Sequence, residues 1–310
     1  GMDALFALYG AYPKHWVTDA DGNLVYGSNT DEAKTALAEI RKLVEDGTID
    51  ASFTVRDSDQ CAELVTSGQA GIFFGAWWNM SWPLNNMVEE DPNIYWNAYL
   101  APLTDDGTYN TATLCPSSSF MVIKAGASEE VKEAAVKVMN YQFDIDQDQG
   151  ESLKSNPSDP YSWTSMPFSI LLSTYTDKET KAEKVLKAAA ELDESELTGE
   201  AAQWYESYQA AEKDVAAAAA DNDLSGWAYV RGCKPLVEGA DIMNKVFDAT
   251  YAKTESMDSK WATLEKLEDE FYLQYLNGEA TDDDFDAYVQ QWNDLGGADI
   301  TAELAEMMVE

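Results

Sequence analysis

Apolar residues in the first half of the chain recur with a helical period in some segments and as short strand-like runs in others. A helix is predicted over residues 32–45, with capping residues at 28–31 before it and a glycine stop after it. Its inward stripe consists of four apolar residues: Ala33, Leu37, Ile40 and Val44. A second helix is predicted after the cap at Asp57, ending at Gly68, and a third over residues 128–139.

Short apolar and aromatic runs between these helices predict strands. The tight turn Asp21-Gly22-Asn23 leads into a strand at residues 24–26. Residues 70–75 form an apolar run between glycines, which is typical of a buried strand. Further strands are predicted at residues 91–102 and 117–123.

Helical patterns dominate the chain after residue 154. Long alanine-rich, charged stretches continue to residue 252, and a helix pair is predicted at residues 264–276 and 283–292. The run Asp282-Asp283-Asp284 lacks the alternating spacing of a calcium loop, and we interpret it as a helix N-terminus, where negative charge is favourable. Because strands alternate with helices early and helices dominate late, the pattern predicts an α/β protein that is rich in helix.

Composition narrows the classes of partner. The 310 residues are enough for two lobes, and 45% of them are hydrophobic, so a sizeable core is expected. Asp and Glu number 57 against 20 Lys and Arg, which gives a formal net charge of −37. A chain this negative repels the phosphates of nucleic acids and anionic membrane surfaces, so neither is expected as a partner. The acidity itself is typical of a highly soluble extracellular surface.

Few residues point to cofactor or covalent chemistry. The three cysteines form no paired motif, and the sole histidine, His15, has no Cys or His beside it. We therefore expect no metal, no cofactor and no Ser-His-Asp arrangement. A membrane span is also not expected, because the chain has no apolar run of about 18 residues. The 10 Trp and 16 Tyr favour a neutral, ring-shaped ligand, because an indole offers a flat apolar face and a polar edge.

Three segments carry a resemblance to a known family. The first is residues 67–78, in which a glycine-flanked apolar run leads to Trp77 and Trp78. The second is residues 114–123 with the helix that follows. The third and most specific is the terminal block, residues 263–301, with its two helix patterns around Asn277-Gly278. Together they resemble extracellular solute-binding proteins of family 1, the sugar-binding lipoproteins of ABC importers, in their long Gram-positive subfamily.

The resemblance implies a fold of the periplasmic-binding-protein-like II type, truncated to mainly the C-terminal lobe. Residues 1–108 and 154–310 would form that lobe, and residues 109–153 would be a strand-helix return segment of the N-terminal lobe. The start at Gly1-Met2 has no basic stretch, apolar signal core or lipid-accepting cysteine. This start is expected either of a cytosolic protein or of a chain cut from a longer precursor. The family implies the second, with a lipid anchor at the cell surface as its only membrane contact.

The family's function implies which residues touch ligand. Its members are not enzymes: they bind an oligosaccharide in an interlobe cleft and deliver it to permease subunits of an ABC transporter. The tryptophan after the glycine-flanked strand stacks on a sugar ring, and such a strand's carboxyl edge is where ligands collect in open α/β sheets. The matching residues are Trp77, Trp78, Asn79 and Trp82. Because neighbours on an extended chain point to opposite sides, we expect one of the adjacent pair in the core and the other toward ligand.

Further ligand contacts are predicted on three later segments. Aromatic and hydroxyl side chains on the loop at residues 161–168 suit sugar hydroxyls, and an arginine beside aromatic rings can bond vicinal hydroxyls or a carboxylate. The family also has a ligand loop near residue 254. The predicted contacts from these segments are Tyr161, Trp163, Trp227, Arg231, Thr254 and Met257.

Two other functional classes stay open at this point. A carbohydrate-active hydrolase or lyase needs two carboxylates at a defined separation, and 57 acidic residues allow such a pair. A surface adhesin or scaffold could keep the fold without transport, and a peptide ligand is also conceivable. None of the carboxylates lies in a recognisable catalytic motif, so the receptor is the leading hypothesis.

Overall fold

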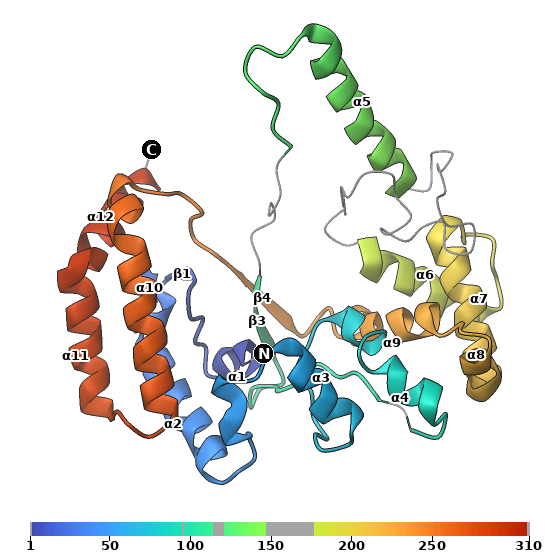
Figure 1. Ribbon diagram of the computed structural model, residues 1–310, viewed down its shortest axis with the longest axis horizontal. Coiled ribbons are helices and arrows are strands. Elements are labelled where there is room, and N and C mark those ends of the chain that lie inside the picture. Colours follow the sequence, from blue (N-terminus) through green and yellow to red (C-terminus); the bar gives the residue numbers. More distant parts are fainter. Residues whose placement is uncertain (1, 95, 114–120, 147–176, 309–310) are drawn as a thin grey trace. The chain divides into compact units, whose positions relative to one another are not determined.

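The computed structural model describes residues 2–94, 96–113, 121–146 and 177–308. The described chain is rich in helix and has few strands (Figure 1). Its contacts divide it into two compact units, each built from segments far apart in the sequence. Unit 1 comprises Gly1–Phe74, Leu100–Cys115 and Asp241–Glu310, and unit 2 comprises Gly75–Tyr99 and Pro116–Ala240.

Unit 1 contains two pairs of strands. The hairpin β1 (Trp16–Thr18) and β2 (Leu24–Tyr26) is antiparallel, and β3 (Tyr109–Thr113) pairs in parallel with β4 (Met243–Phe247). The turn between β1 and β2 forms because the Asp19 carboxylate accepts the backbone N–H of Asn23 at 2.8 Å. The predicted strand at residues 24–26 is confirmed.

Helices supply most of unit 1. They are α1 (Asp3–Leu8), α2 (Asp31–Glu45), α3 (Ser58–Thr66), α10 (Glu255–Leu276), α11 (Asp282–Trp292) and α12 (Ala298–Met307). The short turns are η1 (Gly27–Asn29), η2 (Ala51–Thr54) and the π-helical η5 (Asn293–Gly297). The predicted helices at 32–45, 57–68, 264–276 and 283–292 are confirmed, and the Asp282–Asp284 run is the N-terminal turn of α11 as expected.

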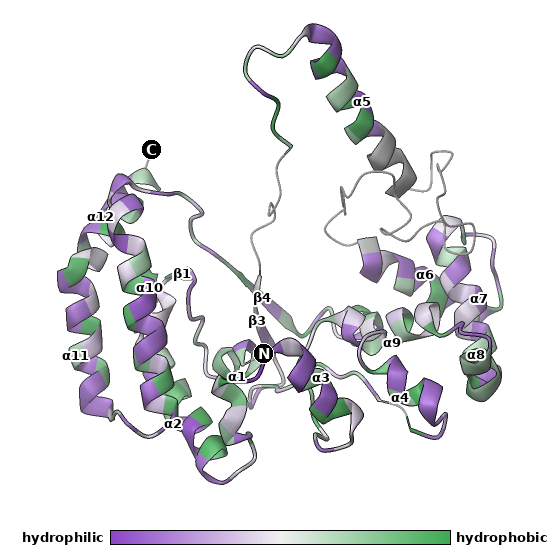
Figure 2. Ribbon diagram, in the orientation of Figure 1, coloured by the Kyte–Doolittle hydropathy of each residue, from purple (hydrophilic) through white to green (hydrophobic). Residues whose placement is uncertain are grey.

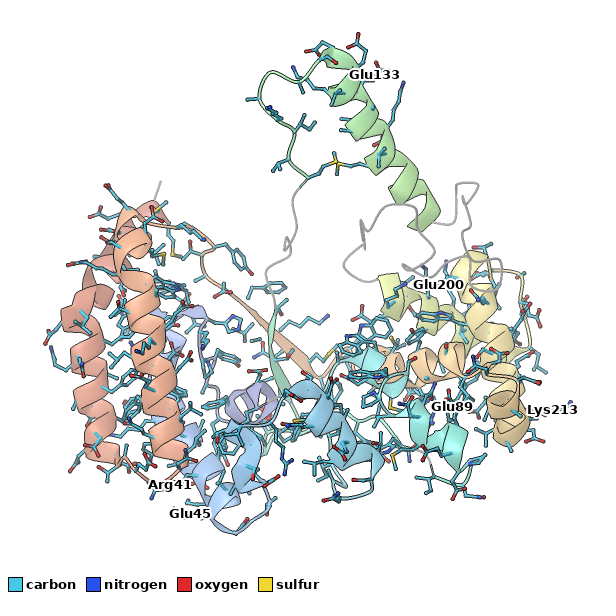
Figure 3. All side chains as sticks on the ribbon, in the orientation of Figure 1. Arg41, Glu45, Glu89, Glu133, Glu200 and Lys213 are labelled. Atoms are coloured by element: carbon cyan, nitrogen blue, oxygen red, sulfur yellow. The ribbon has the colours of Figure 1, made fainter. Side chains whose placement is uncertain are left out.

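The core of unit 1 lies between α2, α10, α11, α12 and the β1–β2 hairpin. Figure 2 shows hydrophobic and hydrophilic colours on both α10 and α11, as expected of helices that bury one face. Two stacked aromatic pairs join the elements: Tyr26 with Trp292 at 5.0 Å, and Phe271 with Tyr288 at 4.5 Å between ring centroids. On the surface of α2, Arg41 and Glu45 form an ion pair at 2.7 Å (Figure 3).

The described secondary-structure elements of unit 2 are all helices or helical turns. Its elements are η3 (Trp77–Met80), α4 (Asn85–Glu90), α5 (Glu129–Asp146), α6 (Asp177–Glu191), α7 (Gly199–Lys213), α8 (Val215–Ala220) and α9 (Ser225–Glu238). Side chains of α6, α7 and α9 form its main core. At the start of α7, Glu200 accepts hydrogen bonds from Lys178 and Lys181 of α6, both at 2.7 Å (Figure 3).

Three strand predictions are wrong where the structure describes them. Residues 70–75 form no strand, and Ile72 is 76% exposed, because no described strand lies beside this run to cover it and take its hydrogen bonds. The described residues of the run 91–102 are also irregular. There the Trp96 carbonyl accepts a hydrogen bond from Arg231 instead of from a neighbouring strand. Of the run 117–123, residues 121–123 are irregular and exposed, and the others lie outside the described residues.

The two units do not follow the predicted domain boundaries. Residues 75–99, predicted to belong with 1–74, group with 116–240 instead. The helix predicted at 128–139 is confirmed and extends to Asp146 as α5. Whether either unit corresponds to a lobe of a binding protein stays a prediction.

Candidate functional site

The predicted site residues fall in both units. Trp77, Trp78, Asn79, Trp82, Trp227 and Arg231 belong to unit 2, whereas Thr254 and Met257 belong to unit 1. Tyr161 and Trp163 lie outside the described residues. The structure thus gathers four of the ten on one turn, η3 and the residues that follow it.

Asn79 holds this turn in shape. Its Oδ1 accepts the backbone N–H of Ala76 at 2.7 Å, and its Nδ2 donates to the carbonyl of Trp82 at 3.1 Å. Asn79 is only 8% exposed, and both polar atoms of its amide form hydrogen bonds with the two ends of the turn. It was predicted to contact ligand, and the structure gives it the role of positioning the tryptophans on either side.

Trp78 and Trp82 are the exposed members of the turn, and we call this pair the aromatic platform. Each is 45% exposed. The backbone N–H of Trp82 donates to the carbonyl of Trp78 at 3.2 Å, so the two residues are separated by one helical turn and lie on the same side. Within the described part of the chain neither indole N–H makes a hydrogen bond. Part of each ring is therefore exposed, and neither indole N–H is used by the described residues.

Trp77 packs inward. Its ring meets Tyr229 edge-on at 5.4 Å and lies 6.4 Å from Trp204. Trp77 is half-buried and Trp78 exposed, which agrees with one inward and one outward ring. The division arises on a 3₁₀ turn and not at the end of a strand.

Helix α9 approaches this turn very closely at Gly232. A Cβ atom at Gly232 would lie 1.9 Å from the carbonyl oxygen of Trp77, so only glycine fits there. Gly226, near the start of α9, similarly faces α7, where a Cβ would lie 2.7 Å from the Cα of Trp204. These two glycines bring α9 against both η3 and α7 and place the aromatic residues of unit 2 together.

Trp227 and Arg231 form a separate group on α9. Trp227 is 5% exposed, and its indole N–H donates to Glu212 at 2.9 Å. The Arg231 guanidinium lies over the Trp227 ring at 4.3 Å and donates to Asn97 at 2.8 Å. The Arg231 guanidinium thus covers a face of the Trp227 ring, and the predicted ligand contact of both residues stays a prediction.

Thr254 and Met257 belong to the start of α10. The Thr254 hydroxyl oxygen accepts the backbone N–H of Met257 at 3.3 Å, which is an N-cap. Thr254 is buried and Met257 packs against the core of unit 1. Their types and spacing are accounted for by the helix cap.

A polar hollow lies in unit 1, and none of its lining residues is a predicted site residue. It has a volume of about 620 Å³ and is open to solvent. The turn before β3 and the paired strands β3 and β4 line it, through Thr104, Asp105, Asp106, Thr108, Asn110 and Asn244. Asn244 donates to Asn110 across the strand pair at 2.9 Å.

Glu268 is a buried carboxylate of unit 1. It is 1% exposed, and its two oxygens accept hydrogen bonds from Tyr26 at 2.9 Å and Ser28 at 2.7 Å. Burial raises the pKa of its carboxyl above the ordinary 4.5, and the two hydroxyl donors and Lys14 oppose that rise. Enclosed in this way, the carboxyl cannot reach a glycosidic oxygen, so Glu268 is a structural acid.

The raised pKa predicts how the stability of unit 1 depends on pH. The folded state favours the protonated form of Glu268. The stability that Glu268 contributes is therefore fully present below pH 4.5 and is lost as the pH rises through the pKa of the folded state. In Glu268→Gln the side chain cannot ionise, so the Tm of the variant relative to wild type is expected to be higher at pH 8 than at pH 4. A change in Tm of about 2–4 °C is expected for each kcal/mol of change in the free energy of unfolding.

Thermal unfolding followed by circular dichroism at the two pH values measures this difference. Glu270→Gln, on the exposed side of the same helix, is the matched control and should show no such pH dependence. A Tm difference for Glu268→Gln that is equal at pH 4 and pH 8 would contradict the assignment.

Neither a metal centre nor a membrane helix is found in the described part of the chain. No three His, Cys, Asp or Glu residues there are grouped to hold a metal ion. No described helix combines the length and hydrophobicity that crossing a bilayer requires.

Tyr229 is the aromatic residue of this region that the sequence-based prediction did not select. It lies three residues before Gly232 and therefore on the face of α9 that meets η3. The charge pattern was a second signal for this region in the sequence, because no charged residue occurs between Glu63 and Glu89 in a chain with 77 charged side chains, 57 acidic and 20 basic.

Comparison with known proteins gives no match for this chain, either among models of protein families or among curated sequences.

Proposed function

We propose that this chain is the extracellular substrate-binding component of an ABC importer and that it binds an oligosaccharide through the aromatic platform. The observation that carries the proposal is the exposure of Trp78 and Trp82, two tryptophans on one side of one turn whose indole N–H groups have no partner among the described residues. Large exposed aromatic groups on a soluble protein mark interaction sites.

A saccharide is the ligand whose chemistry fits this surface best. The axial C–H groups of a pyranose make an apolar face, and its hydroxyl rim offers acceptors for an indole N–H. Two rings that are one helical turn apart can contact more than one sugar unit, which supports an oligosaccharide over a single sugar. Asn79 and Gly232 hold the rings in place before ligand arrives, which reduces the ordering cost of binding.

The fold that accompanies this function is the periplasmic-binding-protein-like II fold. The three sequence segments described above support it, as does the assembly of each unit from segments far apart in the chain. In this mechanism ligand stabilises a closed state by hinge movement, and the permease subunits recognise that state. No bond of the ligand is broken.

Glycan binding and product analysis test the proposal together. The protein is titrated with a panel of oligosaccharides while tryptophan fluorescence is followed, and the same mixtures are assayed for new reducing ends. Saturable quenching without new reducing ends is expected. Release of reducing ends would identify a hydrolase. Absence of binding to every oligosaccharide of the panel would contradict the proposed receptor function.

A further inference from the structure

We infer that Tyr229 is part of the same ligand site: with Trp77 it forms an aromatic corner that binds an uncharged sugar ring and extends the site from η3 onto α9. The inference rests on the proposed function and deepens it. It assigns a residue outside the predicted set and restricts the ligand to neutral saccharides.

The rings of Tyr229 and Trp77 are arranged as two walls. Their centroids are 5.4 Å apart and their planes meet at 66°, an edge-to-face contact. Trp204 supports Tyr229 from the core, at 5.3 Å between centroids. Both Tyr229 and Trp77 are half-buried, whereas Trp204 is fully buried, so only the first two reach solvent.

The polar edges of the corner are unused by the protein. Within the described residues, neither the Tyr229 hydroxyl nor the Trp77 indole N–H makes a hydrogen bond. Some other tyrosine hydroxyls have protein partners: that of Tyr205 accepts from Gln209, and that of Tyr272 donates to the carbonyl of Ser28. A hydroxyl that can both donate and accept, beside an indole donor, matches the rim of a sugar ring.

The close helix approach makes the corner rigid. Gly232 holds the backbone of α9 against the Trp77 carbonyl, and Tyr229 lies on the same face of α9, one turn earlier. The two walls are therefore joined through backbone contact as well as through ring packing. A preformed corner binds without the cost of ordering its side chains.

The charges around the corner favour a neutral ligand. The segment that carries Trp77 has no charged residue between Glu63 and Glu89. Lys178 lies over the buried Trp204 ring at 5.6 Å and is ion-paired with Glu200 at 2.7 Å. The formal net charge of −37 repels uronic and sialic acids at long range.

Two substitutions at Tyr229 test the inference with maltotriose and cellotriose as probes, measured by titration calorimetry. Tyr229→Phe removes the hydroxyl but keeps the ring, and is expected to bind about fivefold more weakly, the effect of one neutral hydrogen bond. Its Tm should equal that of wild type, because the hydroxyl makes no hydrogen bond with any described residue. Tyr229→Leu removes the wall and should bind at least about tenfold more weakly.

Tyr205→Phe in the same unit is the matched control. It loses the hydrogen bond with Gln209 and should leave the affinity for both trisaccharides unchanged. Wild-type affinity in Tyr229→Phe, together with loss of binding in Trp78→Ala, would overturn the inference and leave the proposed function standing. Equal binding of a triuronic acid would overturn the restriction to neutral sugars. Failure of wild type to bind any glycan would overturn both.

Discussion

The double variant Trp78→Ala, Trp82→Ala is expected to bind its glycan about 1,000-fold more weakly than wild type. Each tryptophan would be a central anchor of the site, and truncation of such an anchor costs about 2 kcal/mol, which is about 30-fold in affinity. The figure of about 1,000-fold combines two such losses, and because both rings would contact one ligand, the double variant also measures the coupling between them. Calorimetric titration of both single variants and the double variant measures each contribution.

The same double variant should remain folded. Both side chains are 45% exposed, so their removal leaves no large internal cavity. Tyr99→Ala, which removes another exposed ring of unit 2, serves as the control and should bind glycan like wild type. A double variant that unfolds, or one that keeps wild-type affinity, would contradict the proposal that the aromatic platform is an exposed glycan-binding surface.

Gly232→Ala is expected to destabilise unit 2 by about 3 kcal/mol and to weaken glycan binding with it. Two effects oppose each other at this position. Alanine gains up to about 1 kcal/mol over glycine inside a helix, but its Cβ would lie 1.9 Å from the backbone oxygen of Trp77. The clash outweighs the helix propensity, because a backbone oxygen cannot rotate away and η3 must separate from α9.

Urea unfolding followed by tryptophan fluorescence measures this loss. Seven of the ten tryptophans fall in the residue ranges of unit 2 and three in those of unit 1, so unit 2 contributes most of the signal. Gly71→Ala is the matched control, because a Cβ there would contact nothing within 4 Å, and it should unfold like wild type. An unfolding midpoint for Gly232→Ala at or above that of wild type would show that η3 is not held by α9.

The elements that the sequence predicted correctly are those with strong local signals. Thr30 caps α2 and its apolar residues repeat at helical spacing, while Asp57 and Gln60 form a capping box at the start of α3. Such signals act within a few residues and do not depend on the rest of the fold. Strands depend on partners, and the run 70–75 forms none because no described strand lies beside it.

The sequence by itself predicted the strongly capped helices and the concentration of tryptophans at residues 77–82. It did not predict that α10 begins at Glu255 or that α5 extends to Asp146. Only the tertiary structure decided which of the tryptophan rings are exposed, because exposure depends on side chains that come from distant parts of the chain. Tyr229 covers Trp77, and Glu212 takes the indole N–H of Trp227, whereas Trp78 and Trp82 meet neither a ring nor an acceptor among the described residues. A pattern of apolar residues records how hydrophobic each position is, but it does not record which surface will come to lie against it.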